Sequence, residues 1–166
     1  EADNHLHRAG ELARQSLSEA RRSVHALRPR ALQEHNFWDA LKGTIKNTTV
    51  GTALHTKFAA QGKLPKLPQA WQENLLHIGQ EALTNTLKYA HARNFETRVS
   101  YKAKELRLEL RDDGDGFKVK DRHDGVGLSG MRERVEQMGG QLKITSSRGK
   151  GTKVTVLLPC NGESMS

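Results

Sequence analysis

The chain has one cysteine, four prolines and no long apolar run, and these shortages exclude whole classes of protein. Cys160 has no second cysteine to pair with, so no disulfide holds the fold and we expect a reducing compartment. No apolar stretch approaches the roughly 18 residues of a membrane-spanning helix. The first ten residues are polar, unlike a signal peptide. We therefore expect a cytoplasmic location.

Aromatic residues are also scarce, at 5% of the chain, whereas basic residues are abundant enough to give a net charge of +8. Such a balance fits nucleic acid, an acidic partner or a phosphate-rich ligand. The basic residues are scattered and are not interleaved with aromatic side chains that could stack on bases, so we expect no nucleic-acid partner. A small ligand with several phosphates explains the excess as well.

The apolar residues fall in periodic blocks, which indicates one folded domain within the 166 residues. In residues 11–27 they alternate at spacings of four and three, at Ala13, Leu17, Ala20, Val24 and Leu27. This heptad seam predicts a helix packed against another helix, with a lone amphipathic surface helix as the alternative. Pro29 ends the helix. The chain reads as if it begins partway through a helical hairpin.

The rest of the chain alternates between helical and strand periodicity. Helices are predicted over about residues 34–47, 68–89 and 128–138, and strands over about 53–58, 96–102, 106–112, 141–146 and 153–158. Hairpin-like neighbours imply a mixed, largely antiparallel sheet with helices on one face. The expected fold class is α+β, a two-layer α/β sandwich.

Glu81, Asn85, Lys88 and Tyr89 form the first candidate cluster, on the long central helix. Their spacing places them on adjacent parts of one helical face. Glu81 and Asn85 offer the hard oxygen ligands that suit Mg²⁺ with polyphosphate. Lys88 could reach phosphate oxygens, and Tyr89 offers a flat face to a base. The alternative is the solvated side of an ordinary helix.

A second cluster, Asp112-Asp113-Gly114-Asp115-Gly116, follows a predicted strand. It lacks the later bidentate Glu and the flanking helices of a calcium-binding EF-hand. A corner that reads adenine fits better, because the carboxylate of Asp112 can accept from the exocyclic amine. Gly114 and Gly116 would let the purine lie against bare backbone. An acidic surface turn is the alternative.

A third cluster, Gly125-Val126-Gly127-Leu128, opens a predicted helix. Backbone N–H groups at a helix N-terminus attract phosphate, and the helix dipole adds to this. The pattern is not a Walker loop, because no Gly-Lys-Ser/Thr follows at the required spacing. It is not a Rossmann site either, because the glycines follow a loop and not a strand.

In order and spacing, these clusters together with Thr152 after Gly149-Lys150-Gly151 resemble the ATPases shared by gyrase, heat-shock chaperones, mismatch-repair proteins and histidine kinases. The resemblance covers about residues 69–159 and implies a Bergerat-type fold that binds ATP and Mg²⁺. It implies that Asn85 holds the metal, that Asp112 reads adenine, and that Thr152 supports Asp112 through a hydroxyl or a water. Gly125 and Gly127 would line the triphosphate under a mobile lid.

Residues 80–85 (QEALTN), followed by Lys88 and Ala90, resemble the histidine kinases related to nitrate and membrane-fluidity sensors, as does the run from Glu19 to Pro29. That branch often has His in place of Tyr89; the stacking role of Tyr89 is taken from other kinases. The resemblance implies a dimerisation segment in residues 1–30, an ATP-binding catalytic domain in 31–160 and a tail in 161–166.

The implied function is transfer of the ATP γ-phosphoryl group to a histidine, with Glu81 and Lys88 as catalytic residues, for relay to a response regulator. No histidine here stands in a helix before an acid, so we expect the acceptor upstream of Glu1. This chain alone would bind ATP without phosphorylating itself. The whole protein would be a homodimer, membrane-anchored or soluble. A serine kinase of the anti-sigma-factor type and a non-catalytic ATP-dependent interaction module are the alternatives.

Overall fold

The computed structural model of the chain describes residues 36–118 and 126–160. The predicted dimerisation segment, the tail and Gly125 lie outside this part of the chain. Within it, no helix is long and apolar enough to cross a membrane. The elements in chain order are α3 (Phe37–Thr48), β1 (His55–Gln61), α4 (Gln69–Asn85), the π-helix η1 (Thr86–Ala90), β2 (Asn94–Lys102), β3 (Glu105–Asp112), α5 (Val126–Gln137), β4 (Gln141–Ser146) and β5 (Thr152–Pro159).

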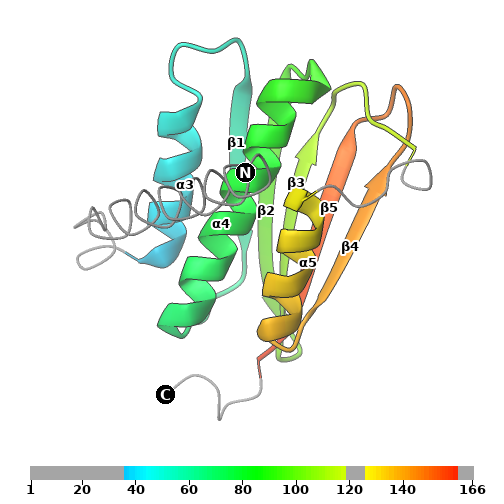
Figure 1. Cartoon of the computed structure of the whole chain (residues 1–166). Coiled ribbons are helices and arrows are strands. Elements are labelled where there is room, and N and C mark those ends of the chain that lie inside the picture. Colours follow the sequence, from blue (N-terminus) through cyan, green and yellow to red (C-terminus); the bar gives the residue numbers. More distant parts are fainter. Residues whose placement is uncertain (1–35, 119–125, 161–166) are drawn as a thin grey trace, which may run out of the picture. The chain divides into compact units, whose positions relative to one another are not determined.

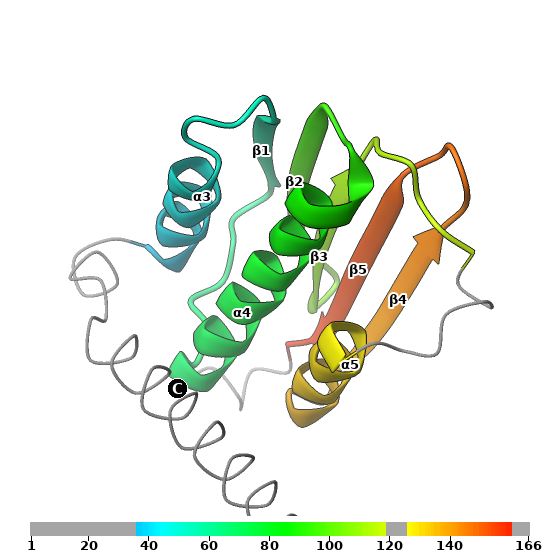
Figure 2. The ribbon, with the colours of Figure 1, turned by 45° about the horizontal axis from the view of Figure 1, so that its top comes forward.

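The five strands form one sheet in the order β1-β2-β3-β5-β4. β1 runs parallel to β2, and the other neighbouring strands are antiparallel. Helices α3, α4 and α5 all lie on the same face of this sheet (Figures 1 and 2). The predicted two-layer α+β fold with a mixed, largely antiparallel sheet is therefore confirmed.

The core lies between the helices and the covered face of the sheet, because strand residues alternate strictly between the two faces. In β3 the buried positions are Leu106, Leu108, Leu110 and Asp112, with more exposed residues between them. Three of these four are leucines, and the fourth is a carboxylate at the strand's end. The same alternation that buries the leucines thus places the carboxylate of Asp112 beneath the helices.

Two predicted helices begin later than their periodicity suggested. The side chain of Asn36 accepts a hydrogen bond from the backbone N–H of Trp38 at 3.3 Å, so Asn36 caps α3 and the helix begins at Phe37. Pro68 occupies the N-cap of α4 and not its first turn. Amphipathic periodicity continues through such capping residues, and this is why it overestimates helix length.

The C-terminal end of the long helix also differs from the prediction. Residues 86–90 remain helical but form a π-helix, which stops at His91 in the left-handed conformation with φ of 49°. The predicted extent to residue 89 is therefore confirmed, whereas the assumption of α-helical geometry there was wrong. This change of geometry matters because it alters which side chains share a face.

Thr97 generates a prediction about stability. Its side chain is fully buried in β2, and its Oγ1 has no hydrogen-bond partner within the described residues. A buried unpaired hydroxyl costs about 1–3 kcal/mol, so Thr97→Val should raise the free energy of unfolding by about 1 kcal/mol. The midpoint of urea unfolding measures this, with the slope unchanged.

Thr86→Val is the matched control, because the Thr86 hydroxyl is also buried but donates to the carbonyl oxygen of Ala82 at 3.0 Å. This substitution should lower the midpoint. If both valine variants shift the midpoint in the same direction, the unpaired state of Thr97 has no energetic consequence.

Candidate functional site

One pocket, partly open to solvent, lies where the C-terminal end of α4, η1, the corner after β3, α5 and β5 meet. Its lining combines mostly apolar side chains with a few polar ones. The lining residues are Ala82, Asn85, Thr86, Tyr89, Ala90, Phe95, Leu110, Asp112, Gly116, Phe117, Leu128, Met131, Thr152 and Val154. Residues from all three sequence clusters therefore meet here, although the clusters are separate in the chain.

The buried carboxylate of Asp112 is the central polar group of the pocket. Its Oδ1 accepts from the backbone N–H groups of Gly114 at 2.9 Å and Thr152 at 3.2 Å. Its Oδ2 lies 3.3 Å from the hydroxyl of Thr86, which shares its one proton between this oxygen and the carbonyl oxygen of Ala82. Each carboxylate oxygen has two lone pairs, so Oδ2 retains capacity for a donor that belongs to a ligand.

Thr152 supports Asp112 in a different way from the one the resemblance implied. The direct contact comes from its backbone N–H, while its hydroxyl lies 3.0 Å from the hydroxyl of Ser146. Ser146 also donates to the carbonyl oxygen of Gly151 and accepts from the backbone N–H of Phe117. Sequence reasoning missed Thr86 and Ser146, because neither belongs to a motif and only the fold brings them to this site.

The glycines of the corner are required by the protein's own backbone. A Cβ on Gly114 would overlap the carbonyl group and Cβ of Ala90, and a Cβ on Gly116 would overlap the carbonyl oxygen of Ser147. Gly116 also has a φ of 60° and lines the pocket, whereas Gly114 does not line it. Gly116 is therefore still placed to contact a purine, as predicted. Gly114 instead packs closely on the end of η1.

The π-helix determines which predicted side chains reach the pocket. Asn85, Tyr89 and Ala90 line it, while Lys88 is exposed and is not among the lining residues. A π-helix places residues five apart in register, so Asn85 and Ala90 share the pocket side and Lys88 turns away. The predicted convergence of four side chains was therefore wrong for Lys88, because it assumed α-helical spacing.

Glu81 lies beside the pocket and not in its lining. Its Oε1 accepts from the side-chain amide of Asn85 at 3.3 Å, and a Cβ on Gly127 would overlap the same oxygen. The carboxylate thus holds Asn85 and fills the space that a glycine leaves in the first turn of α5. Leu128, in the same turn, is buried and lines the pocket. Val126 begins α5, but its side chain lies outside the described part of the chain.

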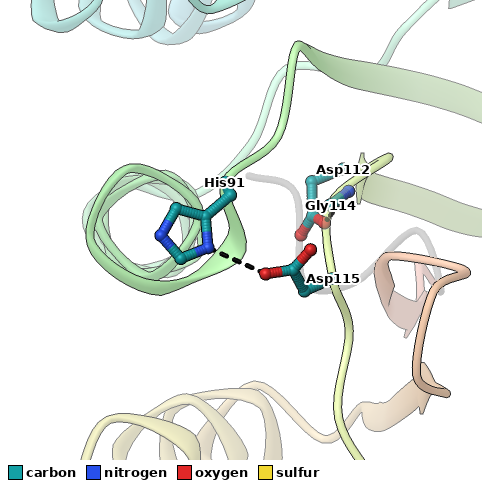
Figure 3. Close-up of polar contacts among 4 residues, drawn as sticks. All are labelled: His91, Asp112, Gly114 and Asp115. Carbon is teal, nitrogen blue, oxygen red and sulfur yellow. Dashed lines mark hydrogen bonds and ion pairs between the residues drawn. The ribbon is translucent and has the colours of Figure 1, made fainter.

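The three acids of the corner have three different sets of partners. Asp113 accepts from the side chain and backbone of Asn94 at 2.7 and 2.8 Å, and these bonds lower the pKa of its carboxyl group. Asp115 lies 2.8 Å from Nδ1 of His91, as Figure 3 shows, with Asp112 and Gly114 nearby. The corner is thereby tied to the start of β2 and to the end of η1.

Comparisons with known proteins agree with this geometry. Residues 72–162 match the family described as histidine kinase-, DNA gyrase B- and HSP90-like ATPases. The histidine-protein kinase/phosphatase DegS of Brevibacillus brevis is 31% identical over 153 residues, which are 92% of this chain and 40% of that protein. The sensor protein VraS of Staphylococcus aureus is 28% identical over 138 residues, covering 82% of this chain and 39% of VraS.

A solved structure with the same fold is the histidine kinase domain of the Erythrobacter litoralis EL346 blue-light activated kinase. It is 22% identical, has a TM-score of 0.63, and the match covers 76% of this chain and 62% of that domain. The chain spans about 40% of the length of DegS and VraS.

The packing of Gly114 predicts a specific sensitivity to a methyl group. Gly114→Ala should lower the free energy of unfolding by about 1–3 kcal/mol, because the new Cβ meets backbone atoms of Ala90 that cannot move aside. Gly130→Ala is the control, since nothing lies within 4 Å of its Cβ position in α5. It should be neutral or stabilise by up to about 1 kcal/mol. Thermal unfolding of both variants is the measurement, and equal midpoints would contradict the close packing.

Proposed function

Because the chain belongs to the histidine kinase-, DNA gyrase B- and HSP90-like ATPase family, we propose that it is the ATP-binding catalytic domain of a two-component sensor histidine kinase. One observation carries the proposal for the ligand: a buried carboxylate, held by three protein donors, faces an apolar pocket beside an amide-bearing helix. The names of DegS and VraS, a kinase/phosphatase and a sensor protein, support the assignment within the family.

Adenine is the part of the ligand that the described residues fit best. The exocyclic amine would donate to Oδ2 of Asp112, and the ring would lie among Leu110, Val154 and Met131 in the pocket floor. Tyr89 lines the rim with 59% of its surface exposed, so its ring can cover a bound base from the solvent side. A mostly apolar pocket that buries a ligand ring, with a few polar groups that hydrogen-bond to the edge of that ring, is typical of small-molecule sites.

Asn85 fits a magnesium ion that arrives with the nucleotide. Its amide N–H donates to Glu81, so its carbonyl oxygen points away from that carboxylate and remains able to bind a cation. The described residues include no cluster of three His, Cys, Asp or Glu side chains that could hold a metal by themselves. This agrees with Mg²⁺, which takes few protein ligands and shares phosphate oxygens. When bound, the ion would neutralise charge on the phosphates.

The remaining residues act by positioning and charge. Glu81 orients Asn85, and the N-terminal turn of α5 presents backbone N–H groups to the phosphates. In the reaction, a histidine nitrogen bonds to the γ-phosphorus as the bond to the β-phosphate oxygen breaks and ADP leaves. Such transfers depend on positioning more than on covalent help. The acceptor helix, the homodimer, the response-regulator partner and the cytoplasmic location are parts of the same proposal.

Asp112→Asn tests the adenine contact. The variant keeps the shape of the side chain but replaces one charged oxygen with a donor, so nucleotide affinity should fall about ten- to a hundredfold, or roughly 1.5–3 kcal/mol. Isothermal titration with ATP measures the change. Asp113→Asn is the matched control, because the Asp113 carboxylate bonds to Asn94 outside the pocket, and it should leave the affinity unchanged. Unaltered binding by Asp112→Asn would reduce Asp112 to a turn residue.

Asn85→Ala tests the metal. Alanine preserves the helix and leaves Asp112 and Tyr89 in place, so nucleotide should still bind without Mg²⁺. The gain in ATP affinity on adding Mg²⁺ should disappear, because one ligand of an ion with strict octahedral geometry is lost. Gln80→Ala, an exposed neighbour on the same helix, is the control and should keep the gain. The measurement is titration of each variant with ATP, in the presence of Mg²⁺ and in the presence of a chelator. If both variants gain the same ATP affinity from Mg²⁺, Asn85 does not bind the metal.

A further inference from the structure

The face of the sheet opposite α3, α4 and α5 is strongly basic. Helices α3, α4 and α5 lie on the other face (Figures 1 and 2). The strand side chains that alternate with the buried ones include seven Lys and Arg against three Glu, a net charge of +4. This one face therefore accounts for half of the chain's net charge of +8.

The three acids of this face are already engaged, and all lie on β2 and β3. The carboxylate of Glu96 lies 2.9 Å from Arg98 and 3.9 Å from Lys57. Both Glu105 and Glu109 pair with Arg107, at 3.9 and 3.6 Å. Charge is thus nearly balanced around β2, whereas β4 and β5 carry only basic charged side chains on this face.

Arg111, Lys143 and Lys153 form what we name the basic patch. Arg111 and Lys153 stand directly opposite each other across β3 and β5, and Lys143 is diagonal to Lys153 because it pairs with Thr155. Within residues 36–118 and 126–160, none of the three has an ion-pair partner within 4 Å. Glu96 is opposite Arg111 in register but bonds to Arg98 instead.

The basic patch opposes the stability of the fold. Like charges directly opposite on neighbouring strands are destabilising, and the turn between β4 and β5 adds the exposed Arg148 and Lys150 at the same end of the sheet. Packing of the core does not require the basic patch, since Arg111, Lys143 and Lys153 all alternate with the buried strand residues and face away from the helices. A cluster that folding alone disfavours indicates a use for its charge.

We propose that the basic patch docks this domain on an anionic phospholipid surface. Among the described strand residues on this face none is aromatic, and Leu157 is its one large aliphatic side chain. Protein interfaces are enriched in aromatic residues and depleted of lysine, and single-stranded nucleic acid needs aromatic stacking. An anionic lipid surface needs only accessible cations, each of which strengthens binding roughly fivefold.

Docking through this face leaves the nucleotide pocket accessible. Arg111 and Lys153 are adjacent in sequence to Asp112 and Thr152, but strand alternation directs the two pairs to opposite faces of the sheet. The lipid surface would therefore lie against the face opposite the helices while the pocket opens on the helix side. This inference goes beyond the proposed function and does not rest on it.

The test is co-sedimentation of the full chain with vesicles of phosphatidylglycerol and phosphatidylcholine, against vesicles of phosphatidylcholine alone. Wild type should bind the anionic vesicles at low salt and dissociate as salt rises above about 0.15 M. The triple variant Arg111→Gln, Lys143→Gln and Lys153→Gln should bind more than tenfold more weakly. It should also unfold at a higher temperature, because it removes the like-charge contacts.

The matched control is Lys42→Gln, Lys46→Gln and Lys66→Gln, which removes the same charge from α3 and the loop before α4. Its affinity for the vesicles should stay within about threefold of wild type, because only cations close to the lipid surface strengthen binding. Equal losses in the two triple variants would show that net charge alone acts, and the proposal fails. The proposal also fails if the wild-type protein does not bind anionic vesicles, or if duplex DNA of equal phosphate concentration displaces the protein from these vesicles completely.

Discussion

A carboxylate buried at the end of a central strand is the constraint on which the rest of the site depends. Such a group is tolerated only when donors surround it, and Asp112 obtains them from three separate segments. Thr86 comes from η1, Gly114 from the corner, and Thr152 from the start of β5. Each segment must therefore come within hydrogen-bonding distance of one side chain. This requirement links elements that are separate in the sequence.

The glycines around Asp112 follow from that constraint, and the π-helix lies beside them. Gly151 has a φ of 72° and a Cβ there would overlap the carbonyl of Asp112, so only glycine lets β5 begin close enough for Thr152 to donate. Gly114 packs on Ala90 in the same way. The widened turn of η1 brings Asn85, Tyr89 and Ala90 to the pocket together. The wall that holds Asp112 is thus also the wall that faces the ligand.

Most of the fold could be predicted from the sequence, because its information lies in local periodicity. The alternation of Leu106, Leu108 and Leu110 identifies β3, and the glycine and acid spacing identifies the corner. The geometry of residues 86–90 could not be predicted, since no residue there signals a π-helix, and the error removed Lys88 from the pocket. Thr86 and Ser146 were missed for another reason: their partners are 26 and 29 residues away, so only the assembled sheet reveals their role.

The ends of β3 and β5 are constrained from both faces at once. A slip of β3 by one residue would put Arg111 in the place of Asp112, and a slip of β5 would put Lys153 in the place of Thr152, so either slip would place a cation beneath the helices. Burial of unpaired cations costs far more than their repulsion on the opposite face. The register that assembles the nucleotide pocket is the same one that places the basic patch on the face opposite the helices.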